Sequence, residues 1–241
     1  MSWLMIKTRA AYHRIAQRAG LGDVVAIHHD RPGAGTVTAF VIVWLVFSGL
    51  TFINPSETAL LAIAPTILFA VIGLIIYAML SGERLIVCQG GVLIGSVAPL
   101  LKPYPIRFEQ IVVGSVVPIS GNIRRFAKHT GLPVMPSVRT AWWSRRGVSL
   151  AGPSPAEARR NTALPQRGEH AGRMGLPWLI GTRSSAEQAT ADIARAAGLA
   201  GFSELARATA TAAPRALTGD PADNDMLLPG IFTPVGPEPR G

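Results

Sequence analysis

The stretch that decides the fold runs from residue 37 to residue 80. It reads VTAFVIVWLVFSGLTFI (Val37–Ile53), NPSE (54–57) and TALLAIAPTILFAVIGLIIYAML (Thr58–Leu80). Glu57 is the only charged residue between Pro32 and Gly82. A helix needs about 20 apolar residues to cross a hydrocarbon core about 30 Å thick, and Asn54–Glu57 has the composition of a turn. The stretch therefore predicts a transmembrane helical hairpin with spans at 37–53 and 58–80.

The composition of the whole chain favours the same class. Of the 241 residues, 49% are hydrophobic and 15% are charged, against about 25% charged in an average soluble domain. A pair of buried core helices is the alternative, but it would need a much larger globule around it. Cys88 is the only cysteine, which excludes an internal disulfide.

Lys and Arg residues on the two sides of the predicted spans give an orientation. The segment 1–36 contains Lys7 and four arginines, the turn has no basic residue, and Arg84 follows the second span. Because cytoplasmic flanks retain positive charge, both termini are expected in the cytoplasm and the protein in the plasma (inner) membrane.

The first 36 residues read as a basic amphipathic helix followed by a linker. Ser2–Ala19 has helical spacing, with Lys7, Arg14 and Arg18 on its polar side, and Gly20 supplies a stop. The helix is expected either to lie at the membrane surface or to pack on the cytoplasmic domain. His28, His29 and Asp30 share no face, so they are interpreted as a polar linker rather than a metal site.

Residues 81–200 change to the period of β-strands. Leu85–Gln89 and Val92–Val97 flank Gly90-Gly91 as a hairpin, and Pro105–Phe108 reads as an edge strand before a corner at Glu109-Gln110. Further strands are expected at 111–119, 138–144, 148–151 and 176–182, and the runs 138–144 and 148–151 are expected to flank a hairpin turn at 145–147. The polar segment 152–175 reads as a flexible loop.

A C-terminal helix is expected after the last strand. Ser184 and Glu187 have the spacing of a capping box, with Ser184 as the N-cap. The apolar side of the helix comprises Ala186, Ala189, Ile193 and Ala197. The chain is thus predicted to be an α+β membrane protein, in which the hairpin precedes a small antiparallel β-sandwich or barrel capped by this helix. Residues 201–241 are expected to form a short helix and a disordered Pro-rich tail.

The chain resembles the bacterial pleckstrin-homology-like (PH-like) membrane proteins. The similar segments are ERLIVCQGGV (83–92), IRFEQIVVGSVVPI (106–119), SRRGVSL (144–150) and WLIGTRSSAEQATA (178–191). The resemblance implies a two-span hairpin, a cytosolic PH-like domain over about 81–200, and an interaction role without a reaction.

The sequence offers no catalytic constellation. Gly147–Ala151 lacks the last glycine of a nucleophile elbow, the histidines have no metal-ligand spacing, and phosphate-loop and dinucleotide motifs are absent. The protein is therefore expected to be no enzyme and to hold no cofactor or metal.

Basic and aromatic residues are the remaining candidates for binding. They form two groups, which comprise Arg124, Arg125 and Lys128, and Trp142, Trp143, Arg145 and Arg146. On a tethered domain they could contact anionic lipid headgroups or a protein partner, or serve only as a solubilising surface, whereas nucleic acid is not expected. The predicted function is a non-enzymatic inner-membrane protein whose PH-like domain binds a protein partner or the headgroup layer. The alternative is an accessory subunit of a membrane enzyme or transporter complex.

Overall fold

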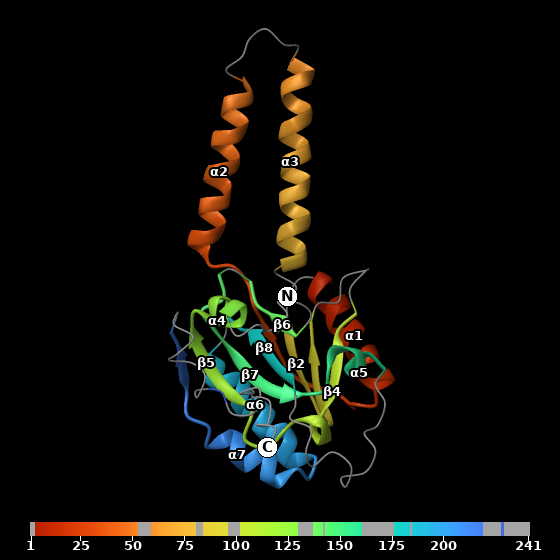
Figure 1. The fold of residues 1–241 in the computed structure, drawn as a ribbon. Coiled ribbons are helices and arrows are strands. Elements are labelled where there is room, and N and C mark those ends of the chain that lie inside the picture. Colours follow the sequence, from red (N-terminus) through yellow and green to blue (C-terminus); the bar gives the residue numbers. More distant parts are fainter. Residues whose placement is uncertain are drawn as a thin grey trace, which may run out of the picture.

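Two β-sheets and a projecting pair of helices make up the computed structural model of the chain (Figure 1). The structure describes residues 3–52, 59–80, 84–95, 102–129, 137–141, 143–160, 176–183, 185–218 and 228. Both sheets belong to one globular part, and helices α2 and α3 project from one end of it.

The first sheet has four antiparallel strands in the order β1-β2-β3-β4. They are β1 (Val24–His29), β2 (Arg84–Cys88), β3 (Gly91–Ile94) and β4 (Tyr104–Arg107). Helix α1 (Trp3–Arg18) covers its outer face, where Tyr12 and Ala16 pack against Ile86, Cys88 and Leu93. Gly20, with a φ of +70°, ends α1 as its position predicts.

The second sheet is mixed and has the order β6-β8-β7-β5-β9. Its strands are β5 (Val117–Gly121), β6 (Val138–Arg139), β7 (Arg146–Gly152), β8 (Leu176–Gly181) and β9 (Arg215–Leu217). The pairs β5–β9 and β6–β8 are parallel, so the predicted purely antiparallel sandwich is wrong. Helix α4 (Ile123–His129) covers the outer face, where Phe126 packs with Leu179 and the tail residue Leu228.

The main core lies between the two sheets. Leu85, Val87, Val148, Trp178 and Ile180 all face it, and each is fully buried. Because side chains alternate across a strand, the remaining apolar residues of β2 and β8 face the outer helices. Coverage on both faces explains why these strands read as continuous apolar runs rather than alternating ones.

Three helices complete the globular part after β7. They are the short α5 (Pro155–Arg160), α6 (Ala186–Leu199) and α7 (Ser203–Ala210). Helix α6 contacts β1, β2 and β3 of one sheet and β5 and β7 of the other. The apolar side predicted for it is confirmed, since Ala186, Ala189, Ile193 and Ala197 are buried. Its N-cap is Ser185, one residue later than predicted, whose Oγ accepts a hydrogen bond from the Gln188 amide at 3.1 Å.

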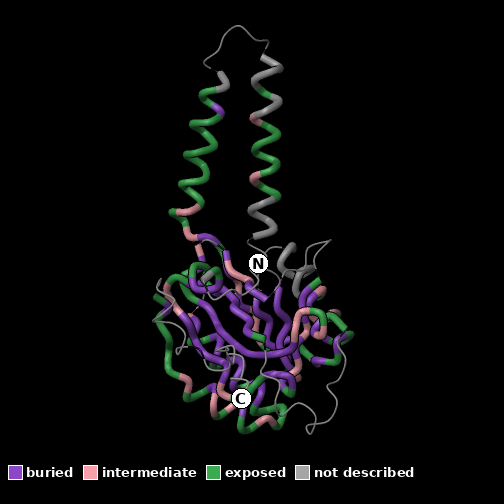
Figure 2. The backbone as a smooth tube through the Cα atoms, in the orientation of Figure 1, coloured by how far each residue is buried: buried purple, intermediate pink, exposed green. Residues whose placement is uncertain are grey.

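Helices α2 (Ala34–Phe52) and α3 (Ala59–Leu80) form the projecting hairpin (Figure 2). Phe47 and Phe69 contact edge to face, with ring centroids 4.7 Å apart. Most described side chains of both helices are exposed, and they include Val43 at 66% and Leu74 at 67%. The hairpin is thus an apolar element that the rest of the described residues leave uncovered.

The predicted membrane crossing is wrong for the part of the chain that the structure describes. Within those residues, no helix combines the length and the apolar character that passage through a bilayer takes. This finding overturns three predictions: the membrane-protein part of the fold class, the integral association through two spans, and the localisation in the inner membrane. The α+β class itself agrees with the two sheets and the helices. The headgroup contact inferred from that anchoring loses its basis.

Several local elements differ from their predictions. Residues 24–29, expected within a linker, form β1, and 123–129 form α4, which was not predicted. The expected hairpin of 138–144 with 148–151 is wrong, because β6 pairs with β8 and β7 pairs with β5 and β8. Within the expected loop 152–175, residues 155–160 are helical, and the remainder from 161 lies outside the described residues.

Candidate functional site: an arginine-lined cavity

A cavity of about 280 Å³ lies at the base of the hairpin, where the globular part meets α2. Four arginines contribute to its lining, together with a few polar and small residues. The lining comprises Asp30, Arg31, Gly33, Thr36, Trp143, Arg145, Arg146, Thr182 and Arg183. These residues come from the β1–α2 connection and the first turn of α2, from the start of β7 and the segment before it, and from the two residues that follow β8.

Backbone hydrogen bonds between strand ends bring these segments together. The Thr182 amide donates to the Arg146 carbonyl at 2.9 Å, and the Arg183 amide donates to the His29 carbonyl at 2.8 Å. The guanidinium of Arg183 donates to the Pro32 carbonyl at 2.7 Å. Arg183 is therefore held at the cavity, in contact with the segment that leads into α2.

Among the lining residues that the structure describes, Asp30 is the only one with a carboxylate. It is 1% exposed and accepts a hydrogen bond from the Ser144 hydroxyl, whose oxygen accepts from the Ala141 amide at 2.8 Å. Burial raises the pKa of Asp30, although these hydrogen bonds oppose the shift. A Cβ at Gly181 would lie 2.6 Å from the Ser144 oxygen, so glycine leaves the space for this pair. The Asp30 carboxyl is thus buried in the wall of the cavity, where it bonds to Ser144.

The side chains of Arg31, Arg145, Arg146 and Arg183 are exposed around the cavity. Among the described residues, none of the four forms an ion pair, although Glu187 lies within electrostatic reach of Arg146. Guanidinium groups that form no ion pair suit an anionic ligand, because they can donate two parallel hydrogen bonds to it.

A second polar pair is buried where β1 packs against α6. His28 of β1 and Asp192 of α6 are both buried, with Nε2 and Oδ2 3.2 Å apart. Arg195 and Gln188 also face Asp192, at 3.5 and 3.3 Å. Burial lowers the pKa of His28, while the charge of Asp192 opposes the shift. These residues join β1 to α6, so His28 is not part of a linker.

The burial of His28 predicts that the folded protein loses stability in mild acid. Below pH 6.5 the unfolded chain binds a proton at His28 that the folded protein takes up only at lower pH. The free energy of unfolding is therefore expected to fall as the pH decreases through this window. Asp30 has the opposite sign, since its raised pKa stabilises the fold at low pH and that contribution disappears as the pH rises above 3.8.

His28→Gln isolates the histidine contribution. Urea unfolding at pH 7.5 and 5.5 should give a smaller difference for this variant than for the unaltered protein. His13→Gln on the surface of α1 is the control, since His13 is about one-third exposed. An equal pH dependence in all three proteins would contradict the assignment to His28.

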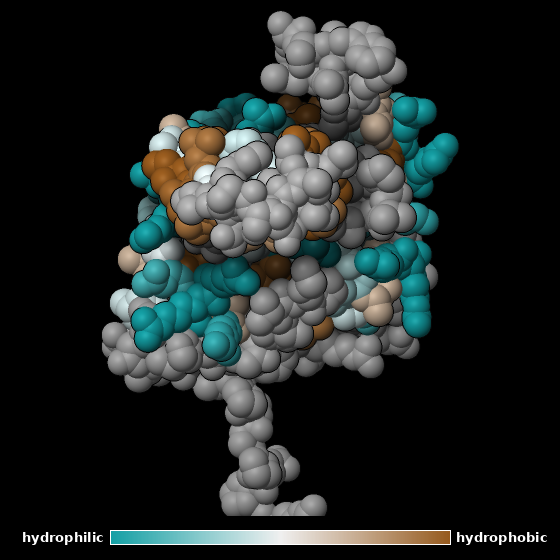
Figure 3. Space-filling model, turned by 90° about the horizontal axis from the view of Figure 1, so that it is seen from above, coloured by the Kyte–Doolittle hydropathy of each residue, from teal (hydrophilic) through white to brown (hydrophobic). Residues whose placement is uncertain are grey.

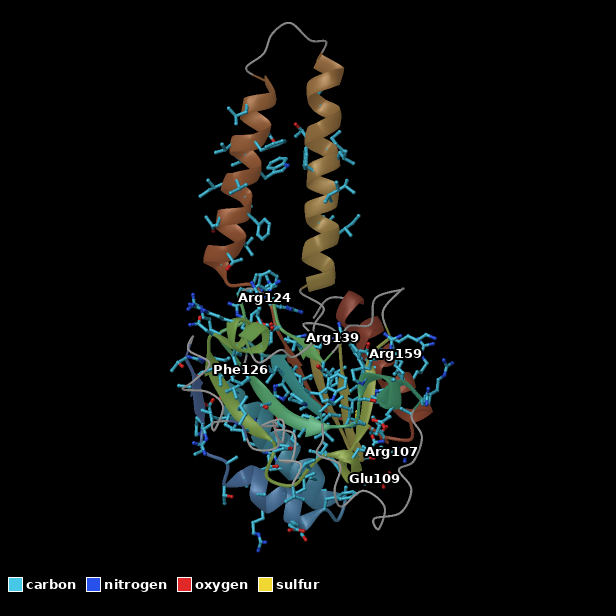
Figure 4. The ribbon with its side chains drawn as sticks, viewed as in Figure 1. Arg107, Glu109, Arg124, Phe126, Arg139 and Arg159 are labelled. Carbon is cyan, nitrogen blue, oxygen red and sulfur yellow. The ribbon has the colours of Figure 1, made fainter. Side chains whose placement is uncertain are left out.

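The structure gathers some of the predicted contact residues and separates others. Trp143, Arg145 and Arg146 line the cavity. Arg124, Arg125 and Lys128 are exposed on α4, and Figure 4 shows Arg124 directly below the lower end of α2. Trp142 lies outside the described residues. We call Arg124, Arg125, Lys128 and the cavity arginines the hairpin-facing basic surface.

The N-terminal helix takes the second of its two expected positions. α1 packs on the first sheet through Tyr12 and Ala16, while Arg14 and Arg18 are exposed. Nothing is described of the Lys7 side chain. Sequence analysis missed Arg31 and Arg183 as site residues, because neither belongs to a dense basic group and only strand pairing brings them to the cavity.

The described residues contain no group of three His, Cys, Asp or Glu side chains placed to hold a metal ion. Cys88 is fully buried, which raises the pKa of its thiol to about 12 and leaves it protonated at neutral pH. Ser149 of the imperfect elbow motif is buried within β7. A larger hollow of about 670 Å³ between α6 and α7 is lined mostly by alanine, threonine and proline. The arginine-lined cavity is therefore the site with the most distinctive chemistry.

Fold and site together define an α+β domain of two packed sheets, with an apolar helical hairpin inserted in it and a basic cavity at the base of that hairpin. In comparisons with known proteins, the chain matches no family model, no curated protein and no solved structure. The resemblance to PH-like membrane proteins stays a prediction.

Proposed function

We propose that the protein is a non-enzymatic binding module whose hairpin-facing basic surface binds an acidic region of a protein partner. The observation that carries the proposal is the set of four arginines around one cavity, without an ion pair among the described residues. A partner carboxylate or other anion would supply the missing counter-charge.

The surroundings of this surface also support a binding role. In Figure 3, hydrophilic side chains lie beside exposed hydrophobic ones at the hairpin end of the molecule. An apolar patch with a polar margin is the usual composition of a protein interface. The resemblance to PH-like domains points to the same kind of role.

Site-specific photo-cross-linking in cells tests the proposal. A cross-linker at Arg124 or Arg145 should trap one discrete partner, whereas a cross-linker at the exposed Ala210 of α7 should not, because α7 lies at the opposite end of the molecule (Figure 1). The adduct should decrease at least tenfold in Arg145→Glu/Arg146→Glu.

The matched control is Arg207→Glu/Arg215→Glu, which makes the same change of net charge at exposed positions on α7 and β9. It should leave the adduct intact. Cross-linking of equal yield from Ala210, or equal loss in both charge-reversed variants, would contradict a binding surface at the hairpin end.

A further inference from the structure

The base of α2 adds a second source of positive potential to the arginine-lined cavity. Gly33 and Thr36, which line the cavity, lie at the start of α2, and the Val37 amide donates to the Gly33 carbonyl at 3.1 Å. The first amides of a helix have no intrahelical acceptor, and glycine has no side chain to cap them. The positive end of the helix dipole therefore lies at the cavity, as in helix N-termini that bind phosphate.

The volume of the cavity suits a small ligand group. Its volume of about 280 Å³ is just below the range of about 300–1,000 Å³ that drug-sized ligands occupy. A Cβ built at Gly33 or Gly35 would meet no atom within 4 Å, so the start of α2 is open to a ligand. The Thr36 side chain adds a hydroxyl among the four guanidinium groups.

Within the described residues, the carboxyl of Asp30 bonds to Ser144 and forms no ion pair with any of the four arginines. It is buried and bonded to Ser144, and burial favours its neutral form. Three features thus agree: four arginines without an ion pair in the described part of the chain, an uncapped helix start, and a small open cavity.

We propose that the cavity at the base of α2 binds a phosphate monoester group, held by Arg31, Arg145, Arg146 and Arg183 and by the first turn of α2. A phosphate monoester carries nearly two negative charges and several acceptor oxygens at neutral pH, which matches several guanidinium donors and free amides. The inference deepens the proposed function and rests on it only for the source of the group, which is either a phosphorylated side chain of the partner or a small phosphate ester.

Thermal unfolding of the full-length protein tests the site directly. The protein is kept in a nonionic detergent that covers the hairpin, in a buffer without phosphate, and inorganic phosphate is titrated against sodium chloride of equal ionic strength. Phosphate at about 100 times its Kd should raise the Tm by about 5–10 °C. An equal rise with chloride would overturn the proposal, because it would show only charge screening.

Two charge-reversed pairs show whether the response belongs to the cavity. Arg145→Glu/Arg146→Glu should abolish the rise in Tm, whereas Arg207→Glu/Arg215→Glu, at exposed positions on α7 and β9, should retain it with the same change of net charge. If the first pair does not fold, Arg31→Gln replaces it, since Arg31 is exposed and outside any strand. Equal responses in cavity and control variants would overturn the proposal.

Two ligands distinguish the sources of phosphate. An acidic peptide with one phosphoserine should bind at least tenfold more tightly than the same peptide without phosphate, and glycerol phosphate should compete with it. Tighter binding of the phosphopeptide than of glycerol phosphate assigns the group to a partner protein, and the reverse order assigns it to a small ester. Equal binding of both peptides overturns the proposal. If cross-linking from Arg145 persists without any phosphate response, only the phosphate site is wrong and the proposed function stands.

Discussion

Trp178→Ala is expected to destabilise the protein by about 3–5 kcal/mol, the range for truncating a buried large aromatic residue. Trp178 is fully buried between the sheets, and its ring lies 5.3 Å from that of Tyr104. Its indole N–H donates to the Pro153 carbonyl at 2.9 Å, so the variant loses a hydrogen bond and leaves a cavity. Since domains of this size are stable by about 5–15 kcal/mol, urea unfolding should show a large shift of the midpoint.

Two further variants make the result specific. Trp178→Phe keeps most of the apolar volume but leaves the Pro153 carbonyl unpaired, so a smaller loss of about 1–3 kcal/mol is expected. Leu199→Ala, at a position 82% exposed, should change stability by less than about 0.5 kcal/mol. A loss for Trp178→Ala no larger than that for Leu199→Ala would contradict the placement of Trp178 in the core.

Replacing residues 34–80 by a short Gly/Ser loop is expected to leave the globular part folded. The reason is the pairing of His29 with Arg84, which places the two ends of the insertion opposite each other on β1 and β2. Shortening a loop of about 50 residues to about 8 lowers the entropic cost of closing it by about 1–2 kcal/mol. The Tm should therefore be retained or raised.

The same replacement should change solution behaviour. The intact hairpin exposes many large apolar side chains, which favour self-association in water. Size-exclusion chromatography with light scattering should show a monodisperse shortened protein without detergent, whereas the full chain should form large species. An unfolded shortened protein, judged by circular dichroism, would show that the hairpin belongs to the core.

Local patterns of the sequence predicted the elements whose determinants are local. Gly90-Gly91 between two apolar runs predicted the β2–β3 hairpin, and the spacing of Ala186 and Ile193 predicted the buried side of α6. β1 was missed because its histidines look like solvent-exposed residues. His28 is compatible with a buried strand because it pairs with Asp192 on α6, which lies far along the chain.

In the candidate site, too, local sequence patterns predicted some features, while others depend on contacts between distant segments. The density of charge around Arg145 and Arg146 indicated a binding surface, and both residues line the cavity. Arg183 lies at the cavity because its amide donates a hydrogen bond to the His29 carbonyl. Asp30 can be buried there because its carboxyl accepts a hydrogen bond from the Ser144 hydroxyl. Neither contact has a local sequence pattern, so the shape of the site could not be predicted.

Burial of β2 on both faces has a consequence for strand register. A one-residue slip would exchange Leu85 and Val87 with Ile86 and Cys88, and apolar side chains would still fill both layers. Hydrophobic pattern alone therefore specifies the pairing of β2 weakly. Glycine provides the missing specificity in the adjacent strand: a Cβ at Gly91 would lie 2.8 Å from the Cα of Arg107, so only a residue without a side chain fits opposite β4 at that point. The alignment of the first sheet thus depends on where a side chain is absent.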